Sequence, residues 1–338
     1  MVELRTDRLE FAFPEVHPKA TMSVTFQRTL RIPDDGNDYP LPPGLGAFPL
    51  CHVDDYPAKV PASWIEHGGV MLPMYQAEAM WLSFETFYDD ERRVNYPCAL
   101  LVATGKVNAI SGQPWAGRLA SDPQNYVVVP DQPWLDGYAV EKGVIRQFVA
   151  MPLGEGYSVE EQVTGKAEHG GLQIMVFPMK REIYERRFPR RPPLADTGVR
   201  YRTAEMAGVC EDSMGLAPGG RMRQEIYEDP YGLSDWDTAA GSRCFVHTAN
   251  SFAWRRITGR RPPTKPITAR QYTKAGLPWF DYYSEKSRAV EGSGLLAGLK
   301  SVVQMGKARR ESPLPENQSV NVGRVIALRT GLRPSPAH

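Results

Sequence analysis

A tryptophan and an aspartate recur in the same order at two places in the chain, separated by a single apolar residue. The first unit is Pro133-Trp134-Leu135-Asp136 and the second is Pro278-Trp279-Phe280-Asp281. Tryptophan rings stack on sugars, and two carboxylates that face each other across a cleft can cleave a glycosidic bond. One predicted function is therefore a hydrolase of glycan-type substrates, with Asp136 and Asp281 as the acid and base. Trp134 and Trp279 would then stack on the substrate.

Turn architecture is the second explanation of these units. A tryptophan that follows a proline packs onto a neighbouring sheet, and an aspartate caps the turn after it. The segment Pro114-Trp115-Ala116-Gly117 repeats the Pro-Trp pair without the aspartate, which favours this explanation. On the sequence alone both interpretations remain open.

His247 is a further candidate for ligand binding, because Asn250 follows it closely. A histidine and an asparagine that meet a cysteine in space form a thiol nucleophile site. Cys244 precedes His247 by three residues, a spacing that places the two side chains on opposite faces of a strand, so the thiol would come from elsewhere. The alternative is a hydrogen-bonded core histidine beside buried, reduced cysteines.

Nucleotide-binding and metal-binding motifs are absent. The sequence contains no GxxxxGK[ST], no GxGxxG, no GxSxG, no CxxC pair and no two histidines at the i,i+4 spacing of a helix. These are the patterns that hold phosphates, activate a serine or bind zinc. We therefore expect neither a cofactor nor a metal ion.

Arginines gather in two segments that also contain aromatic residues. The first segment contains Arg186, Arg187, Arg190 and Arg191, and the second contains Arg255, Arg256, Arg260 and Arg261. Interleaved basic and aromatic residues are typical of proteins that bind single-stranded nucleic acid or other polyanions. Docking onto an acidic partner protein is favoured, because an isoelectric point near 7.7 is low for a nucleic-acid domain.

The net charge of +1 conceals two halves of opposite sign. Residues 1–179 contain 13 lysines and arginines against 23 aspartates and glutamates, whereas residues 180–338 contain 27 against 16. Such halves attract each other within one molecule, or between copies that associate head to tail. Because catalytic signatures are missing, the sequence favours a non-catalytic binding or self-assembling protein, a homo-oligomer that associates through its acidic and basic lobes.

The same charge pattern, together with the proline distribution, predicts four parts. An acidic β-rich domain (1–179) is followed by a basic linker or excursion rich in proline and arginine (180–202). A smaller basic α+β lobe (203–285) and a tail with an amphipathic helix (286–338) complete the chain.

The predicted fold is α+β, with a mainly antiparallel β core of sandwich or barrel type, short capped helices and an extended C-terminal tail. Strands are expected where apolar runs or alternating residues are bounded by turn residues. These segments are 21–33, 98–110, 125–130, 144–152 and 171–178. Capping boxes at Ser158–Glu161 and Thr268–Gln271 predict helix starts, while the apolar periodicity of residues 75–93 fits either a helix or a buried strand.

Neither a signal peptide nor a membrane-spanning segment is expected from the sequence. Charged residues interrupt the N-terminal segment MVELRTDRLEFAF, and no apolar run approaches the roughly 18 residues that span a bilayer. The four cysteines are widely spaced, which is typical of reduced core residues. A cytoplasmic location is the resulting expectation.

Overall fold

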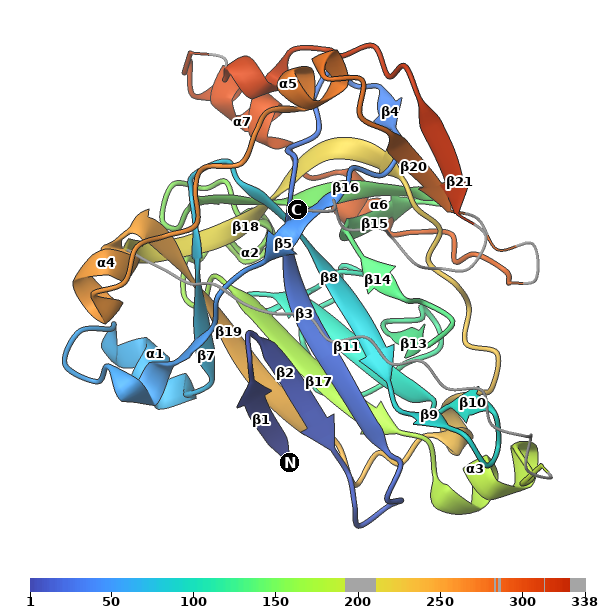
Figure 1. The fold of residues 1–338 in the computed structure, drawn as a ribbon. Helices are drawn as coiled ribbons and strands as arrows, with labels where there is room; N and C mark the ends of the chain where they lie inside the picture. Colours follow the sequence, from blue (N-terminus) through green and yellow to red (C-terminus); the bar gives the residue numbers. More distant parts are fainter. Residues whose placement is uncertain (192–210, 283, 285–286, 313, 329–338) are drawn as a thin grey trace.

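The computed structural model describes residues 1–191, 211–282, 284, 287–312 and 314–328. Its main feature is one large, mostly antiparallel sheet, surrounded by short helices (Figure 1). The α+β class with a β-rich core, predicted from the sequence, is confirmed. Among the described helices, none combines the length and apolar composition needed to cross a membrane.

The sheet follows a continuous antiparallel path through its longer strands. In hydrogen-bonded order these are β1 (Val2–Arg5), β2 (Arg8–Ala12), β3 (Thr21–Thr29), β8 (Ala79–Thr86), β16 (Val144–Pro152), β18 (Glu211–Arg223), β19 (Ser242–Phe252), β17 (Leu172–Pro178) and β11 (Cys98–Thr104). Shorter strands attached to this path are β4 (Asp38–Tyr39), β5 (Gly44–Ala47), β6 (Cys51–His52), β7 (Val70–Met74), β12 (Val107–Asn108), β13 (Val127–Val129), β14 (Trp134–Leu135) and β15 (Gly137–Glu141). Two separate pairs are β9 (Tyr88–Asp89) with β10 (Val94–Asn95), and β20 (Trp279–Tyr282) with β21 (Val325–Leu328).

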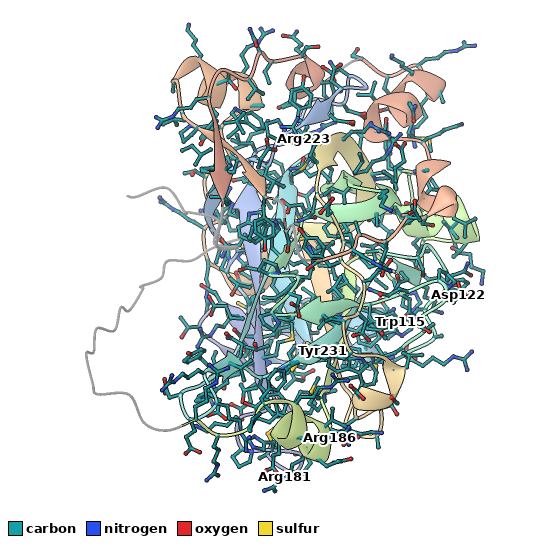
Figure 2. The ribbon with its side chains drawn as sticks, turned by 90° about the vertical axis from the view of Figure 1, so that its right-hand side faces the viewer. Trp115, Asp122, Arg181, Arg186, Arg223 and Tyr231 are labelled. Atoms are coloured by element: carbon teal, nitrogen blue, oxygen red, sulfur yellow. The ribbon has the colours of Figure 1, made fainter. Side chains whose placement is uncertain are left out.

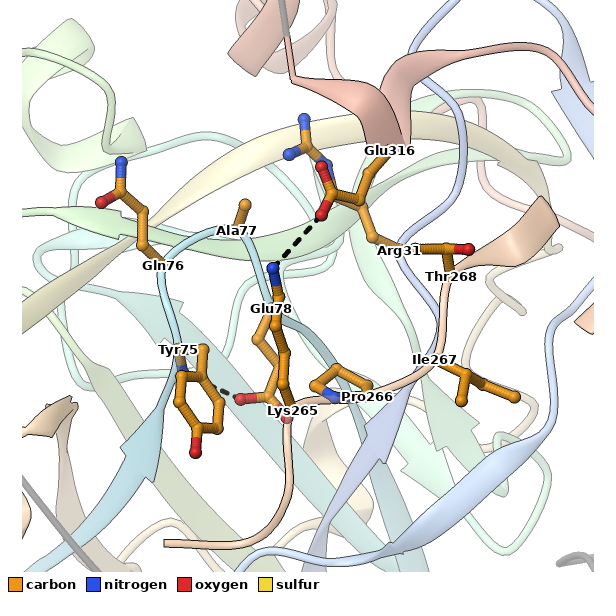
Figure 3. A pocket seen from close by; sticks show the side chains of 10 residues that line it. All are labelled: Arg31, Tyr75, Gln76, Ala77, Glu78, Lys265, Pro266, Ile267, Thr268 and Glu316. Atoms are coloured by element: carbon orange, nitrogen blue, oxygen red, sulfur yellow. Dashed lines mark hydrogen bonds and ion pairs between the residues drawn. The ribbon is translucent and has the colours of Figure 1, made fainter. Parts of the chain in front are cut away.

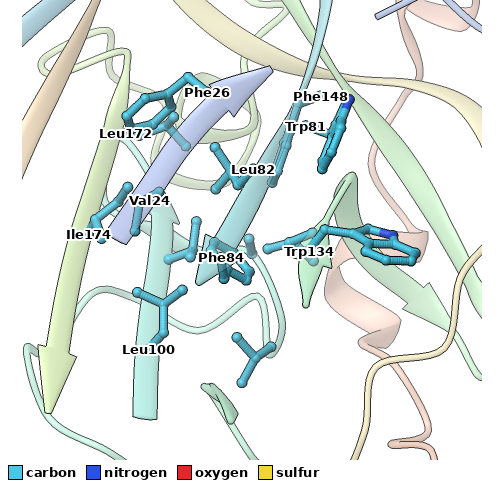
Figure 4. Close-up of a cluster of buried hydrophobic side chains, with 14 of the residues drawn as sticks. Val24, Phe26, Trp81, Leu82, Phe84, Leu100, Trp134, Phe148, Leu172 and Ile174 are labelled. Atoms are coloured by element: carbon cyan, nitrogen blue, oxygen red, sulfur yellow. The ribbon is translucent and has the colours of Figure 1, made fainter. Parts of the chain in front are cut away.

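Side chains that alternate between the two faces of the strands form the core. In β3, Met22, Val24 and Phe26 are fully buried, whereas the residues between them are partly exposed. Because successive side chains of a strand point to opposite faces, the apolar set of β3 lies on one side of the sheet. Figure 4 shows Val24 and Phe26 in one buried cluster with residues of β8, β11 and β17 such as Leu82 and Ile174.

The described helices are short. The described α-helices are α1 (Ala62–His67), α2 (Val159–Thr164), α3 (Arg181–Arg187), α4 (Ala253–Thr258), α5 (Ala269–Lys274), α6 (Gly294–Ala297) and α7 (Val302–Ala308). Of these, α2, α5, α6 and α7 begin after a serine or threonine that caps them. Both capping boxes predicted from the sequence are present, at Ser158 with Glu161 and at Thr268 with Gln271. The segment 75–93, for which the sequence allowed either a helix or a buried strand, contains the buried strand β8.

The predicted four-part division remains a prediction, but strands from both sides of the proposed linker belong to one sheet. β18 pairs with β16, and β19 pairs with β17. The proposed linker begins as helix α3, which buries Tyr184, and its residues 192–202 lie outside the described part of the chain. In the tail, Leu296 and Val302 are buried, and β21 pairs in parallel with β20, so these segments lie against their own chain.

Candidate functional site at two Gly-Gly turns

A four-residue segment, Glu-His-Gly-Gly, occurs twice and leads into a strand each time. Residues 66–69 precede β7, and residues 168–171 precede β17. Both strands pair with β19, and Val246 of β19 lies opposite Val70 on one side and Leu172 on the other. The sheet therefore brings the two segments to the same stretch of β19.

The two turns bring three histidine rings and two larger aromatic rings together. The ring centroid of His67 lies 5.0 Å from that of His169, 6.3 Å from that of His247 and 4.7 Å from that of Phe245. Trp64 of α1 stacks on His247 at 4.7 Å. We call His67, His169 and His247 the histidine cluster. Its members come from a helix end, a turn and a central strand.

A buried carboxylate orients His169. Glu160 of α2 is 2% exposed, and its Oε1 lies 3.1 Å from Nδ1 of His169. Its Oε2 accepts the backbone N–H of His169 at 3.1 Å and that of Gly170 at 2.8 Å. An ionised carboxylate only accepts hydrogen bonds, so Nδ1 carries the proton and the lone pair of the neutral ring lies on Nε2. This is the arrangement in which a histidine acts as a general base.

Burial keeps members of the cluster neutral. Burial lowers the pKa of His247 to about 4, and its Nε2 lies 3.0 Å from the Gly68 carbonyl oxygen, to which it donates. The pKa of His169 is also lowered, mainly by burial, while Glu160 opposes this shift. Both rings are consequently neutral at neutral pH. Across the described residues, no group of three or more His, Cys, Asp or Glu side chains is arranged to hold a metal ion.

The low pKa of His247 predicts a loss of stability in acid. The pKa in the unfolded chain is about 6.5, so between about pH 6.5 and pH 4 the unfolded state binds a proton that folded His247 does not. Folding stability therefore falls as the pH falls through this window, by about 2 kcal/mol between about pH 7.5 and pH 5. Urea unfolding at the two pH values measures this difference.

Substitution variants separate His247 from other titrating groups. We expect His247→Gln to reduce the difference between the two pH values by about 2 kcal/mol. His52→Gln, at an exposed histidine, serves as the control and should leave the difference unchanged. Equal pH dependence in wild type and His247→Gln would contradict the assignment.

The structure buries the indoles of both Pro-Trp units. Trp134 is 2% exposed and Trp279 is fully buried. Trp134 packs against Tyr282, with ring centroids 4.9 Å apart, and Trp279 donates its Nε1–H to Thr273 Oγ1 at 3.2 Å. Neither indole lies open on the surface as a stacking platform.

The carboxylates of these units are held by two consecutive residues. Asp136 is fully buried, and its Oδ2 accepts Nε2–H of Gln224 at 2.9 Å. Asp281 is partly exposed and accepts three hydrogen bonds from Arg223, one from Nε at 3.1 Å and two from Nη2 at 2.9 Å. Gln224 is buried and Arg223 exposed, so one carboxylate lies inside the molecule and the other at its surface. The roles of Asp136 and Asp281 as acid and base remain a prediction.

Each arginine segment begins on a helix, α3 or α4, and continues just beyond its end, and the two helices are far apart in Figure 1. In Figure 2, Arg186 of α3 lies at the opposite end of the molecule from Arg223. Several of the arginines already have protein partners: Arg187 binds Asp235 at 2.6 Å, Arg190 binds Glu91 at 3.1 Å, and Arg260 donates to Cys51 Sγ at 3.3 Å. Arg186, Arg191, Arg255, Arg256 and Arg261 are exposed. Polyanion binding and docking onto an acidic partner remain predictions.

A groove of about 640 Å³ lies away from the histidine cluster. Its wall includes the carboxylates of Asp122, Glu228, Asp229 and Glu291. Lys142 already binds Glu291 at 2.5 Å, and Asp229 accepts hydrogen bonds from Trp236 and from two backbone N–H groups. The volume is sufficient for a small ligand, and the lining favours a cationic one.

Sequence analysis found only one member of the histidine cluster, His247. His67, His169 and Glu160 were missed, although a visible signal existed in the repeated Glu-His-Gly-Gly segments. The described cysteines Cys51, Cys98 and Cys244 are buried and form no disulfide, as the reduced-core interpretation predicted.

Comparison with known proteins gives no relative from which a role can be transferred. No family model matches the chain, and no curated protein or solved structure matches it significantly.

Proposed function

We propose that the protein is a hydrolytic enzyme in which His169 is the general base and Glu160 is its orienting carboxylate. The observation that carries this proposal is the 3.1 Å contact between Glu160 Oε1 and His169 Nδ1, made by a carboxylate that is 2% exposed. This contact fixes the tautomer of the ring and stabilises the imidazolium that forms when Nε2 takes a proton.

Water is the group that the base would activate. Within the described part of the chain, no hydrogen bond joins His169 to a serine, threonine or cysteine side chain, so the geometry supplies no protein nucleophile beside it. A neutral histidine oriented by a carboxylate can instead remove a proton from a water molecule that attacks the substrate. The His169 side chain is 13% exposed, so part of it reaches solvent.

Aromatic surfaces beside the base favour a substrate with an apolar or planar part. Phe245 stacks on His67, and Arg243 lies over the Phe245 ring at 4.7 Å. A guanidinium next to an aromatic face can stabilise a developing negative charge such as that of a carboxylate or an oxyanion. An ester or amide with an aromatic substituent fits these neighbours best.

The test is hydrolysis of chromogenic nitrophenyl esters, phosphoesters and glycosides by the full chain. We expect cleavage of an ester, with a rate that falls at least about 100-fold in His169→Gln and falls also in Glu160→Gln. His52→Gln is the matched control, since it changes an exposed histidine outside the cluster and should retain the wild-type rate.

Two results would overturn the proposal. One is an unchanged rate in His169→Gln, which would place the activity elsewhere. The other is a wild-type protein that cleaves no substrate of the panel faster than free imidazole does. In the latter case the non-catalytic binding or self-assembling role predicted from the sequence would be the one to pursue.

A further inference from the structure

The two residues of the proposed catalytic pair lie in one connection of the sheet. Glu160 and His169 both belong to residues 153–171, which join β16 to β17 and include α2. We call this segment the catalytic connection. Val159 and Glu160 are buried, whereas residues 163–168 are all exposed. The core therefore anchors the connection over only part of its length.

A segment near the C-terminus contacts α2 of this connection. Residues 300–311 contain α7, and we call them the C-terminal clamp. Gln162 of α2 donates its Nε2–H to the Lys300 carbonyl oxygen at 3.0 Å. The Lys300 backbone N–H donates to Gln162 Oε1 at 2.8 Å. One side chain of α2 is thus hydrogen-bonded twice to the backbone of the clamp.

Further contacts join the clamp to the part of the connection that precedes α2. Val302 is 3% exposed and belongs with Tyr157 to a small buried cluster. The Tyr157 hydroxyl donates to Glu311 Oε2 at 2.5 Å, and the Arg309 guanidinium lies over the Tyr157 ring at 5.3 Å. Arg309 also pairs with Glu155 at 3.1 Å. The clamp therefore contacts the connection both before α2 and within it.

The segments on either side of the clamp are fixed to the body of the protein. Before the clamp, Leu296 of α6 is 1% exposed. After the clamp, Glu316 forms an ion pair with Lys265 at 3.4 Å (Figure 3), and Asn317 accepts a hydrogen bond from Arg31 at 2.6 Å. The contacts of the clamp with the catalytic connection consequently form within one molecule, at a high effective concentration.

The clamp contact and the catalytic contact lie on different faces of α2. Glu160 and Gln162 are two residues apart, and side chains at this spacing do not face each other on a helix. Glu160 accepts the backbone N–H groups of His169 and Gly170, at 3.1 Å and 2.8 Å, whereas Gln162 contacts the clamp. α2 thus lies between the clamp and the turn that contains His169.

We propose that the C-terminal clamp regulates the proposed active site by holding α2, and with it Glu160, against His169. This inference rests on the hydrolytic function proposed above and adds its regulation. While the clamp is docked, Glu160 keeps the proton of the His169 ring on Nδ1 and leaves Nε2 free to act as the base. Release of the clamp removes the support of α2 and frees the ring. Because the ion pair between Arg309 and Glu155 is partly exposed, high salt weakens the docked state.

Two variants of the full chain weaken the clamp from opposite sides. Gln162→Met removes both hydrogen bonds to Lys300, and Val302→Ala truncates the buried side chain of the clamp. Val163→Met is the matched control, because it places the same side chain as the first variant at the next position of α2, which is exposed.

Amide hydrogen exchange of His169 and Gly170 measures local opening of the site, since both N–H groups bind Glu160. We expect Gln162→Met and Val302→Ala each to accelerate this exchange about 5-fold or more. Added salt should accelerate the exchange in the wild type, and the control variant should leave it unchanged.

The ring nitrogen resonances of His169 give a second readout, which a general loss of stability does not change. The wild type should show a protonated Nδ1 and an unprotonated Nε2. In both clamp variants the released ring exchanges its proton between the two nitrogens, so the two resonances should move toward each other. The rate of ester hydrolysis should fall in the same two variants.

Unchanged exchange and unchanged ring resonances in both variants would overturn the proposal. A change in Gln162→Met alone would also overturn it, because Gln162 donates a further hydrogen bond to Tyr157 within its own connection. These readouts do not require hydrolysis, so the two proposals can fail separately. A wild type that cleaves no ester, with variants that shift the His169 resonances, refutes the hydrolase and supports the control of His169 by the clamp. Ester cleavage that requires His169 and is equal in wild type and both variants refutes the regulation alone.

Discussion

Replacement of Gly69 by alanine is expected to destabilise the fold by about 2–5 kcal/mol. Gly69 has a φ of +91°, and a Cβ atom at this position would lie well under 3.0 Å from the Phe245 carbonyl oxygen. The positive φ alone costs roughly 1–2 kcal/mol for a residue with a side chain. The close approach to a backbone atom of β19 adds about 1–3 kcal/mol, because the sheet itself must shift to make room.

Gly165→Ala provides a matched control for this substitution. Gly165 ends α2 with a φ of +71°, and a Cβ atom there would meet nothing within 4 Å. Its replacement therefore costs only the strain of the positive φ, about 1–2 kcal/mol. Urea unfolding of both variants separates backbone strain from steric overlap. If Gly69→Ala loses no more stability than Gly165→Ala, the close packing of the turn against β19 is wrong.

The Gly69 variant also bears on the proposed active site. Gly69 lies two residues after His67, and its close approach to Phe245 fixes how the turn meets β19. A shift of this turn would move His67 relative to His169, whose rings are now 5.0 Å apart. The second turn packs against β19 in the same way, since a Cβ atom on Gly171 would overlap the Val246 carbonyl oxygen.

Local patterns predicted the elements of this protein well. The alternation in residues 21–33 gives β3, the apolar run at 144–152 coincides with β16, and the capping boxes give α2 and α5. Each of these signals depends on residues at most a few positions apart, where side-chain periodicity and capping decide the conformation. The secondary structure of residues 75–93 could not be decided from the sequence, because a buried strand and a buried helix segment have the same kind of apolar run.

The candidate site depends on contacts that periodicity does not encode. His67 meets His169 only because β7 and β17 both pair with β19, in registers that join residues 70, 172 and 246. The Pro-Trp units show that similar sequence segments need not place their side chains in similar surroundings. Trp134 contacts Tyr282, the residue directly after the second unit, yet the two carboxylates lie on opposite sides of residues 223–224, because successive side chains of an extended chain alternate.

Removal of Arg28 is the second substitution with a large expected effect. Arg28 and Glu78 are 7% and 3% exposed, and Arg28 Nη2 lies 2.8 Å from Glu78 Oε1. Loss of one member of a buried ion pair leaves the other charge without compensation, which costs about 3–5 kcal/mol. We expect Arg28→Met to lose stability in this range in urea unfolding at about pH 7.5. Arg28→Met/Glu78→Gln removes the remaining charge and should recover most of the loss.

The pH dependence of the stability of Arg28→Met tests whether the uncompensated Glu78 carboxylate causes the stability loss. Burial already raises the pKa of Glu78, and Arg28 is the main group that opposes this shift. Without Arg28 the folded-state pKa rises further above that of the unfolded chain, so folded Glu78 binds a proton more readily than unfolded Glu78. Stability is then lost as the pH rises through the folded-state pKa. The deficit of Arg28→Met relative to wild type should therefore be smaller at pH 5 than at pH 7.5. A deficit that is equal at both pH values, and that Glu78→Gln does not reduce, would show that the guanidinium stabilises the fold by packing and not by its charge.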